Sequence, residues 1–222
     1  MPLKAVIFDL DGILVRTDRF HYQAWKRLAD EIGVPFDQRR NEALKGVDRM
    51  NSLLAMLPAD HGYSPDELVE LADRKNAHYV QLIRQITPAD LVDGALALVD
   101  ELKASGVALA VASASKNAMT VLDRLGIAGR FDAIVTGHDF ARGKPAPDIF
   151  LTAAGRLGVP PADCAVLEDA ESGVRAALAA GMTALGFGSG EVLGAADLVV
   201  DDMRRLSHRT LSELVARKQR TA

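Results

Sequence analysis

Two carboxylates lie two positions apart at the end of the first apolar run of the chain. Residues 7–17 read IFDLDGILVRT, so Asp9 and Asp11 follow a segment typical of a buried strand, and Gly12 permits a tight bend behind them. One carboxylate in such a place can attack as a nucleophile while the other moves a proton. An acidic turn would explain the pair if it stood alone, so the interpretation depends on the residues that join it.

The residues that follow the next three apolar runs are mostly polar. They are Ser113, Ala114, Ser115, Lys116 and Asn117 after the second run, Lys144 after the third, and Glu168 and Asp169 after the fourth. Ligands bind beyond the carboxyl ends of parallel strands, so we expect these residues to meet at one edge of a sheet. Mg²⁺ prefers hard oxygen ligands, which favours Asp9 and Asp169 as metal ligands, with Glu168 as a further candidate.

A cation and a helix N-terminus complete this set. Lys144 can balance the negative charge of a phosphoryl group, and a helix that begins just after Ser113 would offer its free N–H groups to the same phosphoryl group. Together with an attacking carboxylate and a metal ion, these are the parts that phosphoryl transfer requires. The residues therefore predict phosphoryl transfer, with an aspartyl phosphate as a possible product of the attack.

The elements that position these residues alternate between strand and helix. Short apolar runs at 5–8, 107–111, 133–135, 165–167, 184–187 and 198–200 indicate strands of a parallel sheet buried on both faces. Helical patterns at 94–105, 149–157 and 174–180 each stop at a glycine, a common C-terminal signal, and 208–220 is predicted as a basic amphipathic helix. The alternation predicts an α/β fold with a doubly wound, Rossmann-like parallel-sheet core.

One long segment interrupts this alternation. No strand-like run occurs between residues 17 and 86, whereas 20–32 has a helical pattern and the capping box at Ser64 to Glu67 opens a long helix towards Ile86. We therefore predict an inserted all-helical cap domain. The predicted core comprises residues 1–15 and 88–222, the cap comprises 16–87, and the hinge lies near 14–17 and 86–92.

The composition restricts the partners that the chain can have. Its 222 residues carry 26 basic and 30 acidic side chains, a formal charge of −4, with no basic block that would favour nucleic acid or an anionic membrane. The apolar runs are too short to span a bilayer, and residues 1–4 lack the pattern of a signal peptide. The single cysteine, Cys164, excludes an internal disulfide and fits a reducing compartment. We expect a cytoplasmic monomer that binds a small molecule.

Four motifs of the chain resemble those of the haloacid dehalogenase superfamily of phosphotransferases. They are FDLDG at 8–12, SAS at 113–115, KPAPDIF at 144–150 and LEDAESG at 167–173. Three cap segments are similar to those of the β-phosphoglucomutase family: HYQAWKRLADEIG at 21–33, NEALKGVDRMNSL at 41–53 and RKNAHYV at 74–80. The resemblance spans the whole chain, and superfamily phosphatases do not, as a rule, share these cap segments.

This resemblance implies an isomerase that interconverts β-D-glucose 1-phosphate and D-glucose 6-phosphate through an aspartyl phosphate and β-glucose 1,6-bisphosphate, with one Mg²⁺ per active site. Asp9 would be the nucleophile, Asp11 the acid/base with its backbone carbonyl on the metal, and Glu168 and Asp169 the acidic metal-binding pair. The transferring phosphate would be held by Ser113, Ala114 and Lys144, and the second phosphate by Arg49, Ser115 and Asn117. The sugar site and cap closure would involve Thr17, His21, Trp25, Lys45, Gly46, Ser52 and Lys75.

Alternatives remain open at this point. The same core motifs would serve a Mg²⁺-dependent sugar-phosphate phosphatase, and a phosphosugar-binding regulatory module without turnover is the non-enzymatic alternative. Trp25 could equally be a packing residue, and His21 could pack at the hinge. Arg16 departs from the superfamily pattern, which usually has an acidic residue at this position. We expect a cation there to change the balance between the open and closed cap.

Overall fold

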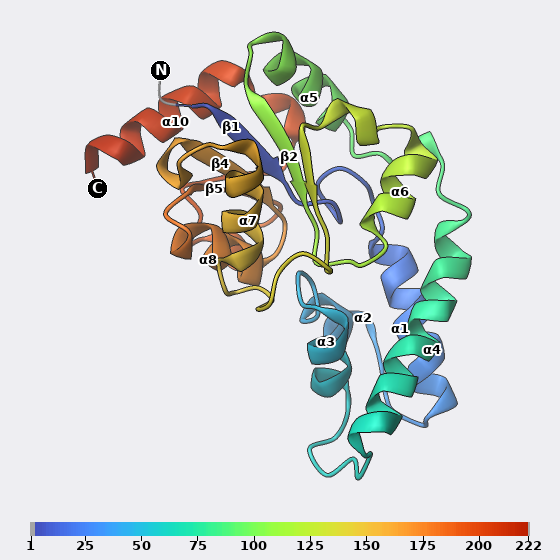
Figure 1. Ribbon diagram of the computed structural model, residues 1–222. Helices are drawn as coiled ribbons and strands as arrows, with labels where there is room; N and C mark the ends of the chain where they lie inside the picture. The colour runs from blue at the N-terminus through green and yellow to red at the C-terminus, as the bar shows by residue number, and fades with distance from the viewer. Residues whose placement is uncertain (1–2, 222) are drawn as a thin grey trace.

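The computed structural model of the protein describes residues 3–221, and within them six strands form one sheet (Figure 1). The strands are β1 (Ala5–Phe8), β2 (Ala108–Ala112), β3 (Ala133–Val135), β4 (Cys164–Glu168), β5 (Thr183–Phe187) and β6 (Leu198–Val200). Their order across the sheet is β3-β2-β1-β4-β5-β6, and all neighbours run parallel. The order reverses beside β1, so the crevice at the carboxyl ends of β1 and β4 is where this topology binds ligands.

Helices cover both faces of the sheet, because successive side chains of a strand point to opposite sides. Val6 and Phe8 of β1 enter the core cluster that is completed by α5 (Ala95–Ala104), α6 (Ala118–Leu125) and α10 (His208–Thr221). Ala5 and Ile7 enter the opposite cluster, which is completed by α7 (Asp148–Leu157), α8 (Glu171–Ala179) and α9 (Gly190–Leu193). Short 3₁₀ turns lie at η1 (Pro88–Asp90), η2 (Ala128–Arg130), η3 (Pro161–Asp163) and η4 (Met203–Arg205). The predicted doubly wound parallel-sheet core is confirmed.

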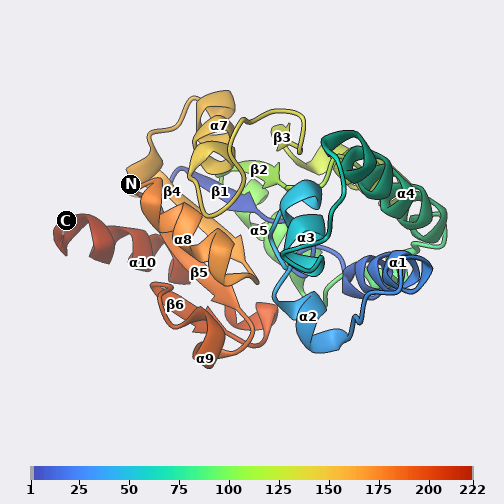
Figure 2. The same ribbon diagram turned by 90° about the horizontal axis from the view of Figure 1, so that it is seen from below.

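The chain between β1 and β2 contributes a separate group of helices. They are α1 (Asp18–Glu31), α2 (Gln38–Glu42), α3 (Arg49–Met56) and α4 (Pro65–Ile83). Trp25, Leu53 and Leu71 belong to a hydrophobic cluster of this group, distinct from the two clusters of the sheet. Figures 1 and 2 show the four helices beyond the carboxyl ends of the strands. The division into a core of 1–15 and 88–222 and a cap of 16–87 stays a prediction, and residues 1, 2 and 222 lie outside the described residues.

The long helix of this group begins where the sequence predicts. Ser64 Oγ accepts the backbone N–H of Glu67 at 3.3 Å, and the Glu67 carboxylate accepts the backbone N–H of Ser64 at 2.7 Å. This capping box satisfies N–H groups that the first turn cannot pair internally. The helix ends at Ile83, short of the predicted Ile86, and the backbone is extended at Thr87 before Pro88.

The helix expected just after Ser113 begins instead at Ala118, which corrects the prediction. Ser113 Oγ accepts the N–H of Ser115 at 3.1 Å, and Ser115 Oγ accepts the N–H of Asn117 at 3.2 Å. Such bonds from a hydroxyl to a nearby N–H compete with helix formation. Residues 113–117 therefore form a loop at the carboxyl end of β2, and the helix N-terminus lies farther along the chain.

Two further observations concern predictions made from composition. No helix within residues 3–221 has both the length and the apolar character needed to cross a membrane. Cys164 is a fully buried free thiol at the start of β4, and burial, together with the nearby Asp163 charge, raises its pKa to about 12. The thiol therefore packs in the core as a small apolar group and does not offer a reactive thiolate.

Candidate active site

Asp9 lies directly beyond the carboxyl end of β1. Its backbone N–H donates to the Leu167 carbonyl of β4 at 3.0 Å, and this register sets Asp9 beside Glu168, the last residue of β4. Lys144, from the loop between β3 and α7, reaches both carboxylates: its Nζ lies 2.6 Å from Asp9 Oδ1 and contacts Glu168 Oε1. All three side chains are buried. Three strand ends thus bring together residues that are far apart in the sequence.

The charges at this point are unbalanced. Burial raises the pKa of Asp9 to about 8, although the Lys144 ammonium favours the ionised form. Burial also raises the pKa of Asp169 well above its usual range, and repulsion by Glu168 and Asp9 adds to the effect. Burial alone would lower the pKa of Lys144, but its two carboxylate partners raise it above its usual value. Lys144 contacts only Asp9 and Glu168, and Lys45 lies 3.6 Å from Asp169, so a further cation among these three carboxylates would relieve their repulsion.

The donor atoms at this point fit Mg²⁺. Asp9 and Asp169 both line the cavity described below, and a Cβ at Gly12 would overlap the Asp169 carboxylate, so only glycine leaves room for it there. Glu168 faces Lys144, and its Oε2 accepts the N–H of Ala170 at 3.0 Å. Within residues 3–221, no three His, Cys, Asp or Glu side chains gather as a ready metal site. A metal here would thus take few side-chain oxygens and keep several waters, as Mg²⁺ usually does.

Asp11 is held from the cap side of the site. Thr17 Oγ1 donates to Asp11 Oδ1, and His21 Nε2 lies 3.7 Å from the same oxygen. His21 Nδ1 lies 3.2 Å from Lys75 Nζ. Burial raises the pKa of Asp11, but His21, Thr17 and Lys144 together bring it below its usual value, while burial and the Lys75 charge lower the pKa of His21. An ionised carboxylate beside a neutral imidazole is able to accept a proton.

A cavity of about 790 Å³ lies between the core and the cap helices. The predicted residues that line it are Asp9, Asp11, Ala114, Ser115, Asn117 and Asp169 from the core, and His21, Trp25, Lys45, Gly46, Arg49, Ser52 and Lys75 from the cap helices. Behind its wall, Thr17 bonds to Asp11, Ser113 to Ser115, and Lys144 to both Asp9 and Glu168. The structure therefore brings all the predicted site residues together at one place.

The turn between α2 and α3 touches the core at the edge of this cavity. Lys45 Nζ lies 3.6 Å from Asp169 Oδ2, and 2.9 Å and 3.4 Å from the carboxylates of Glu42 and Asp18. Ser172 Oγ donates to the Lys45 carbonyl at 3.3 Å. A Cβ at Gly46 would lie only 2.6 Å from Ser172 Oγ, so glycine at this position permits the approach. These contacts describe a cap that is closed over the site.

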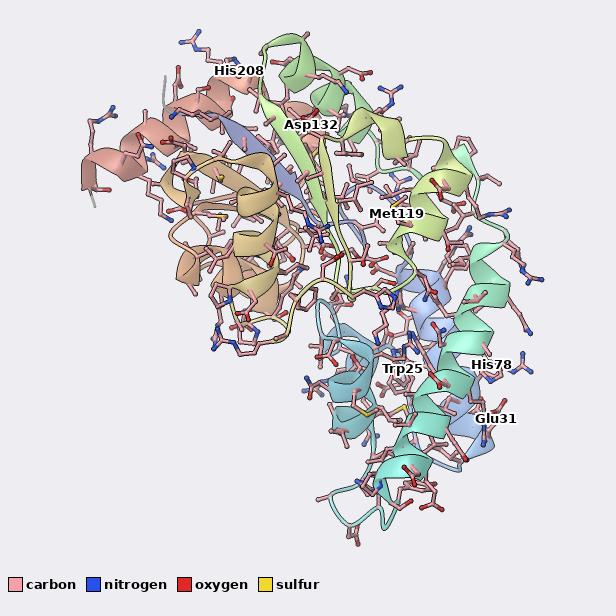
Figure 3. The ribbon with its side chains drawn as sticks, in the orientation of Figure 1. Trp25, Glu31, His78, Met119, Asp132 and His208 are labelled. Carbon is pink, nitrogen blue, oxygen red and sulfur yellow. The ribbon has the colours of Figure 1, made fainter. Side chains whose placement is uncertain are left out.

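Trp25 both packs in the cap and lines the cavity, and its role at a sugar site stays a prediction. It packs in the cap cluster between α3 and the α1–α4 pair (Figure 3), and its ring lies 4.6 Å from Lys75 Nζ at the cavity wall. Burial and the nearby Arg49 charge lower the pKa of Lys75 to about 7. Arg49 itself lies 3.3 Å from Asp73, and Ser52 Oγ donates to the Val47 carbonyl at 3.3 Å.

The cavity also has residues that the sequence analysis did not assign to it. Among these are Asp18, Asn76 and Tyr79, and Lys116, which was expected at this edge of the sheet without a role, also lines the cavity. Asn76 and Tyr79 lie on α4 one and four residues after Lys75, but the helical spacing alone does not reveal which face meets the core.

Comparison with known proteins identifies the family. A model of haloacid dehalogenase-like hydrolases matches residues 3–181. The chain belongs to this family. Membership implies a general dependence on Mg²⁺, in agreement with the donor set described above. The superfamily predicted from the four core motifs is confirmed.

Individual relatives cover nearly the whole chain. The β-phosphoglucomutase of Bacillus subtilis (strain 168) is 47% identical over 95% of this chain and 95% of its own length. The crystal structure of β-phosphoglucomutase from Clostridium difficile has a TM-score of 0.93 at 39% identity, covering 97% of this chain and 98% of that chain. The fructose-1-phosphate phosphatase YqaB of Escherichia coli (strain K12) is 33% identical over 81% of this chain and 94% of its own length. The resemblance to β-phosphoglucomutases is confirmed, and phosphatases are also similar to this chain.

Proposed function

We propose that the protein is a β-phosphoglucomutase, an isomerase that interconverts β-D-glucose 1-phosphate and D-glucose 6-phosphate through β-glucose 1,6-bisphosphate. The observation that most supports this proposal is that one cavity is lined by two sets of anion-binding groups. The first set lies around Asp9 and consists of Ala114, which lines the cavity, and Lys144, whose Nζ lies 2.6 Å from Asp9 Oδ1 just behind the wall; Arg49, Ser115 and Asn117 form the second set. A bisphosphate intermediate requires both sets, because one phosphate is transferred while the other is held.

The proposed reaction has two half-reactions at Asp9. In the first, the C6 hydroxyl oxygen of β-glucose 1-phosphate attacks the phosphorus of the Asp9 phosphate, the bond from phosphorus to Asp9 breaks, and Asp11 accepts the hydroxyl proton. The bisphosphate then reorients. In the second, an Asp9 oxygen attacks the C1 phosphate, the bond from phosphorus to the sugar oxygen breaks, and Asp11 returns the proton to that oxygen. Glucose 6-phosphate leaves, and Asp9 is phosphorylated again.

The neighbouring residues would hold the charge that moves in these steps. Lys144, Ser113 and Ala114 would bind the transferring phosphoryl group, and Arg49, Ser115 and Asn117 would bind the second phosphate. Asp9, the Asp11 backbone carbonyl, Asp169 and Glu168 are the proposed ligands of one Mg²⁺, which when bound supplies positive charge beside the transferring group. The acidic donors and their mutual repulsion support this assignment.

The cap would exclude water while the sugar reacts. Lys45, Gly46 and Ser52 lie on the part of the cap nearest the core, and Trp25 and Lys75 line the wall where a sugar ring would lie. Thr17 and His21 would tie Asp11 to the closed cap. Exclusion of water favours transfer to the sugar over hydrolysis of the aspartyl phosphate.

The cellular setting completes the proposal. We propose a cytoplasmic monomer with a small phosphosugar as its partner and with no nucleic acid or membrane partner. The net charge of −4 and the buried free thiol of Cys164 support this proposal.

A coupled assay tests the proposed function. The protein, Mg²⁺ and traces of β-glucose 1,6-bisphosphate are mixed with β-glucose 1-phosphate, and glucose 6-phosphate is followed through its dehydrogenase, with the α anomer as control. Rapid formation from the β anomer alone is expected. Steady release of inorganic phosphate without glucose 6-phosphate would identify a phosphatase instead. Binding without turnover under any metal condition would identify a regulatory module, an alternative against which the buried Asp9–Lys144 pair argues.

A further inference from the structure

Helix α4 presents a polar face to the cavity. Asp73 and Asn76 lie one turn apart on this helix, and both line the cavity. Asp73 pairs with Arg49 inside the cap at 3.3 Å. Asn76 contacts the core instead: its Oδ1 accepts a hydrogen bond from Asn117 Nδ2 at 2.8 Å, across 41 positions of sequence. This bond joins the cap to the loop that carries the SAS motif.

The Asn117 side chain is held from the cap and not from its own helix. Asn117 precedes the first residue of α6, where a side chain often caps the helix, yet it makes no such cap bond. Its backbone N–H is taken by Ser115 Oγ at 3.2 Å. Within residues 3–221, Asn76 is the one hydrogen-bond partner of the Asn117 side chain. The orientation of this amide therefore depends on the position of the cap.

We propose that Asn76 is a positioning residue for the second phosphate. By accepting one N–H of the Asn117 amide, it fixes the plane of the amide and leaves the other N–H for the phosphate. The inference rests on the proposed function, in which Asn117 holds the phosphate that is not transferred. When the cap opens, the amide loses this partner and is free to rotate. The second phosphate site thus takes its full form in the closed state only.

This arrangement links ligand size to closure. A sugar phosphate whose phosphate occupies the second site meets an oriented donor only in the closed cap, so its binding favours closure by the difference in affinity between the two states. A small acyl phosphate reacts at Asp9 without placing a phosphate in the second site, so it does not use the Asn76–Asn117 bond. Loss of the Asn76 amide should therefore weaken the binding of sugar phosphates and leave the rate of Asp9 phosphorylation by a small donor unchanged.

A double-mutant cycle with Asn76→Ala and Asn117→Ala tests the proposal. The dissociation constant of glucose 6-phosphate is measured by calorimetry, and the rate of Asp9 phosphorylation is measured with acetyl phosphate. We expect each single substitution to raise the dissociation constant of glucose 6-phosphate about 3- to 10-fold, the range expected for the loss of one hydrogen bond. The double variant should bind glucose 6-phosphate as tightly as Asn117→Ala alone does, because Asn117→Ala has already removed the Asn76–Asn117 interaction. In turnover, KM should rise more than kcat falls.

The control is Gln81→Ala, which also removes an amide side chain from α4 but at an exposed position away from the cavity. It should match the parent in both measurements. Additive losses in the cycle, or an equal loss of acetyl phosphate reactivity in Asn76→Ala, would overturn the proposal. Turnover of β-glucose 1-phosphate by the parent tests the proposed function separately, since the cycle is read from binding. A parent that does not bind glucose 6-phosphate would overturn both.

Discussion

Asp9 and Asp11 lie two positions apart just beyond the end of β1, and their surroundings shift their pKa values in opposite directions. Burial dominates at Asp9 and raises its pKa to about 8, with Lys144 opposing the shift. At Asp11 burial is outweighed by His21, Thr17 and Lys144, and its pKa is lowered. A pair of carboxylates separated in this way can divide attack and proton transfer between them. The assignment of the attack to Asp9 follows from its contact with Lys144, which a transferring phosphoryl group would share.

Replacing the proposed nucleophile gives the first prediction. Asp9→Asn should abolish both glucose 6-phosphate formation and phosphate release, a loss of roughly 10³-fold or more, because the amide cannot form the aspartyl phosphate. The fold should persist, since Lys144 keeps Glu168 as a partner. Phosphoenzyme is measured by intact-protein mass spectrometry after acetyl phosphate treatment, with the exposed Asp60→Asn as control. Appreciable turnover in Asp9→Asn would mean that another residue attacks.

Lys75 is a buried cation whose presence should reduce stability. Its ammonium lies 4.6 Å and 4.9 Å from the rings of Trp25 and Tyr79, and no carboxylate lies within ion-pair distance of it in the described residues. Burial and the charge of Arg49 lower its pKa to about 7 from the usual 10.5. The unfolded chain therefore binds more protons at this group than the folded protein does between these two pKa values. The free energy of unfolding should therefore rise with pH between about 7 and 10.5, and this gain should be lost again as the pH falls through the window to about 7.

The second prediction is that Lys75→Met stabilises the protein while impairing sugar-phosphate turnover. The free energy of unfolding should rise by about 1–4 kcal/mol near pH 6, as when other buried charges are replaced by apolar groups of similar volume. This gain should shrink towards about pH 9, because the parent then loses the buried charge. Urea denaturation at both pH values measures the effect, and the exposed Lys26→Met serves as control. A gain that does not change with pH would place the Lys75 pKa outside this window.

Most residues of the site could be predicted because they belong to short motifs at strand ends. Asp9, Lys144 and Asp169 follow apolar runs, and the topology of a parallel sheet brings them together. Asn76 and Tyr79 could not be predicted in the same way. Their side chains meet the core only because α4 packs beside α1 and the cap is closed. A local sequence pattern predicts neither of these conditions. Glu168 could be placed at the site from its motif, but its contact with Lys144 depended on side-chain geometry.

At the scale of elements, the two segments that join cap and core form one paired unit. The backbone N–H of Arg16 donates to the Asp90 carbonyl at 2.7 Å, and the N–H of Val92 donates to the Leu14 carbonyl at 3.0 Å. The Arg16 guanidinium donates to the Leu91 carbonyl at 3.0 Å and lies 3.0 Å from the Asp93 carboxylate. The cation at this unusual position therefore ties the first linker to the second. Among the contacts within residues 3–221, the Arg16 guanidinium makes no hydrogen bond or ion pair with Asp9 or Asp11.

The third prediction concerns this tie. Arg16→Asp should loosen the linkers, because it removes a hydrogen bond and sets a carboxylate near that of Asp93. We expect the open cap to become more populated and KM to rise roughly two- to fivefold, as for the loss of one exposed polar contact. Small-angle scattering with and without ligand measures closure, and Arg27→Asp on α1 carries the same change of charge away from the linkers. No change in closure or in kcat/KM would make Arg16 a neutral surface residue.

The elements themselves were predicted to different degrees. All six strands lie within a residue or two of the apolar runs that predicted them, because strands buried on both faces have few polar residues. The short helices α2 and α3 have no apolar periodicity long enough to detect. Each begins after an aspartate that caps it, and only α3 packs into the cap cluster, through Leu53 and Met56. The predicted start of α6 was wrong because the hydroxyls of Ser113 and Ser115 accept hydrogen bonds from nearby backbone N–H groups, and these bonds hold the segment as a loop where a first helical turn was expected.

At the scale of the whole molecule, the function depends on how the two lobes meet. The cavity has walls from both, and the cap reaches the core through Lys45 and Gly46 on one side and through Asn76 on the other. Lys45 bears directly on the chemistry, because its ammonium lies 3.6 Å from Asp169, a proposed metal ligand. Its three carboxylate neighbours outweigh burial and raise its pKa above the usual value, so it stays charged. Closure therefore brings a permanent cation to the acidic cluster.

The last prediction follows from this contact. Lys45→Met should keep the bulk of the side chain but remove the attraction between cap and core, so water should reach the aspartyl phosphate more often. We expect the ratio of inorganic phosphate released to glucose 6-phosphate formed to rise about 3- to 10-fold, the effect of one partly buried charged contact. Both products are measured in one coupled assay. The control is Lys26→Met, a cap lysine whose one ion pair within residues 3–221 is with Asp30 of its own helix, and it should leave the ratio unchanged. A fall in both products with the ratio preserved would show that Lys45 binds the sugar phosphate without controlling closure.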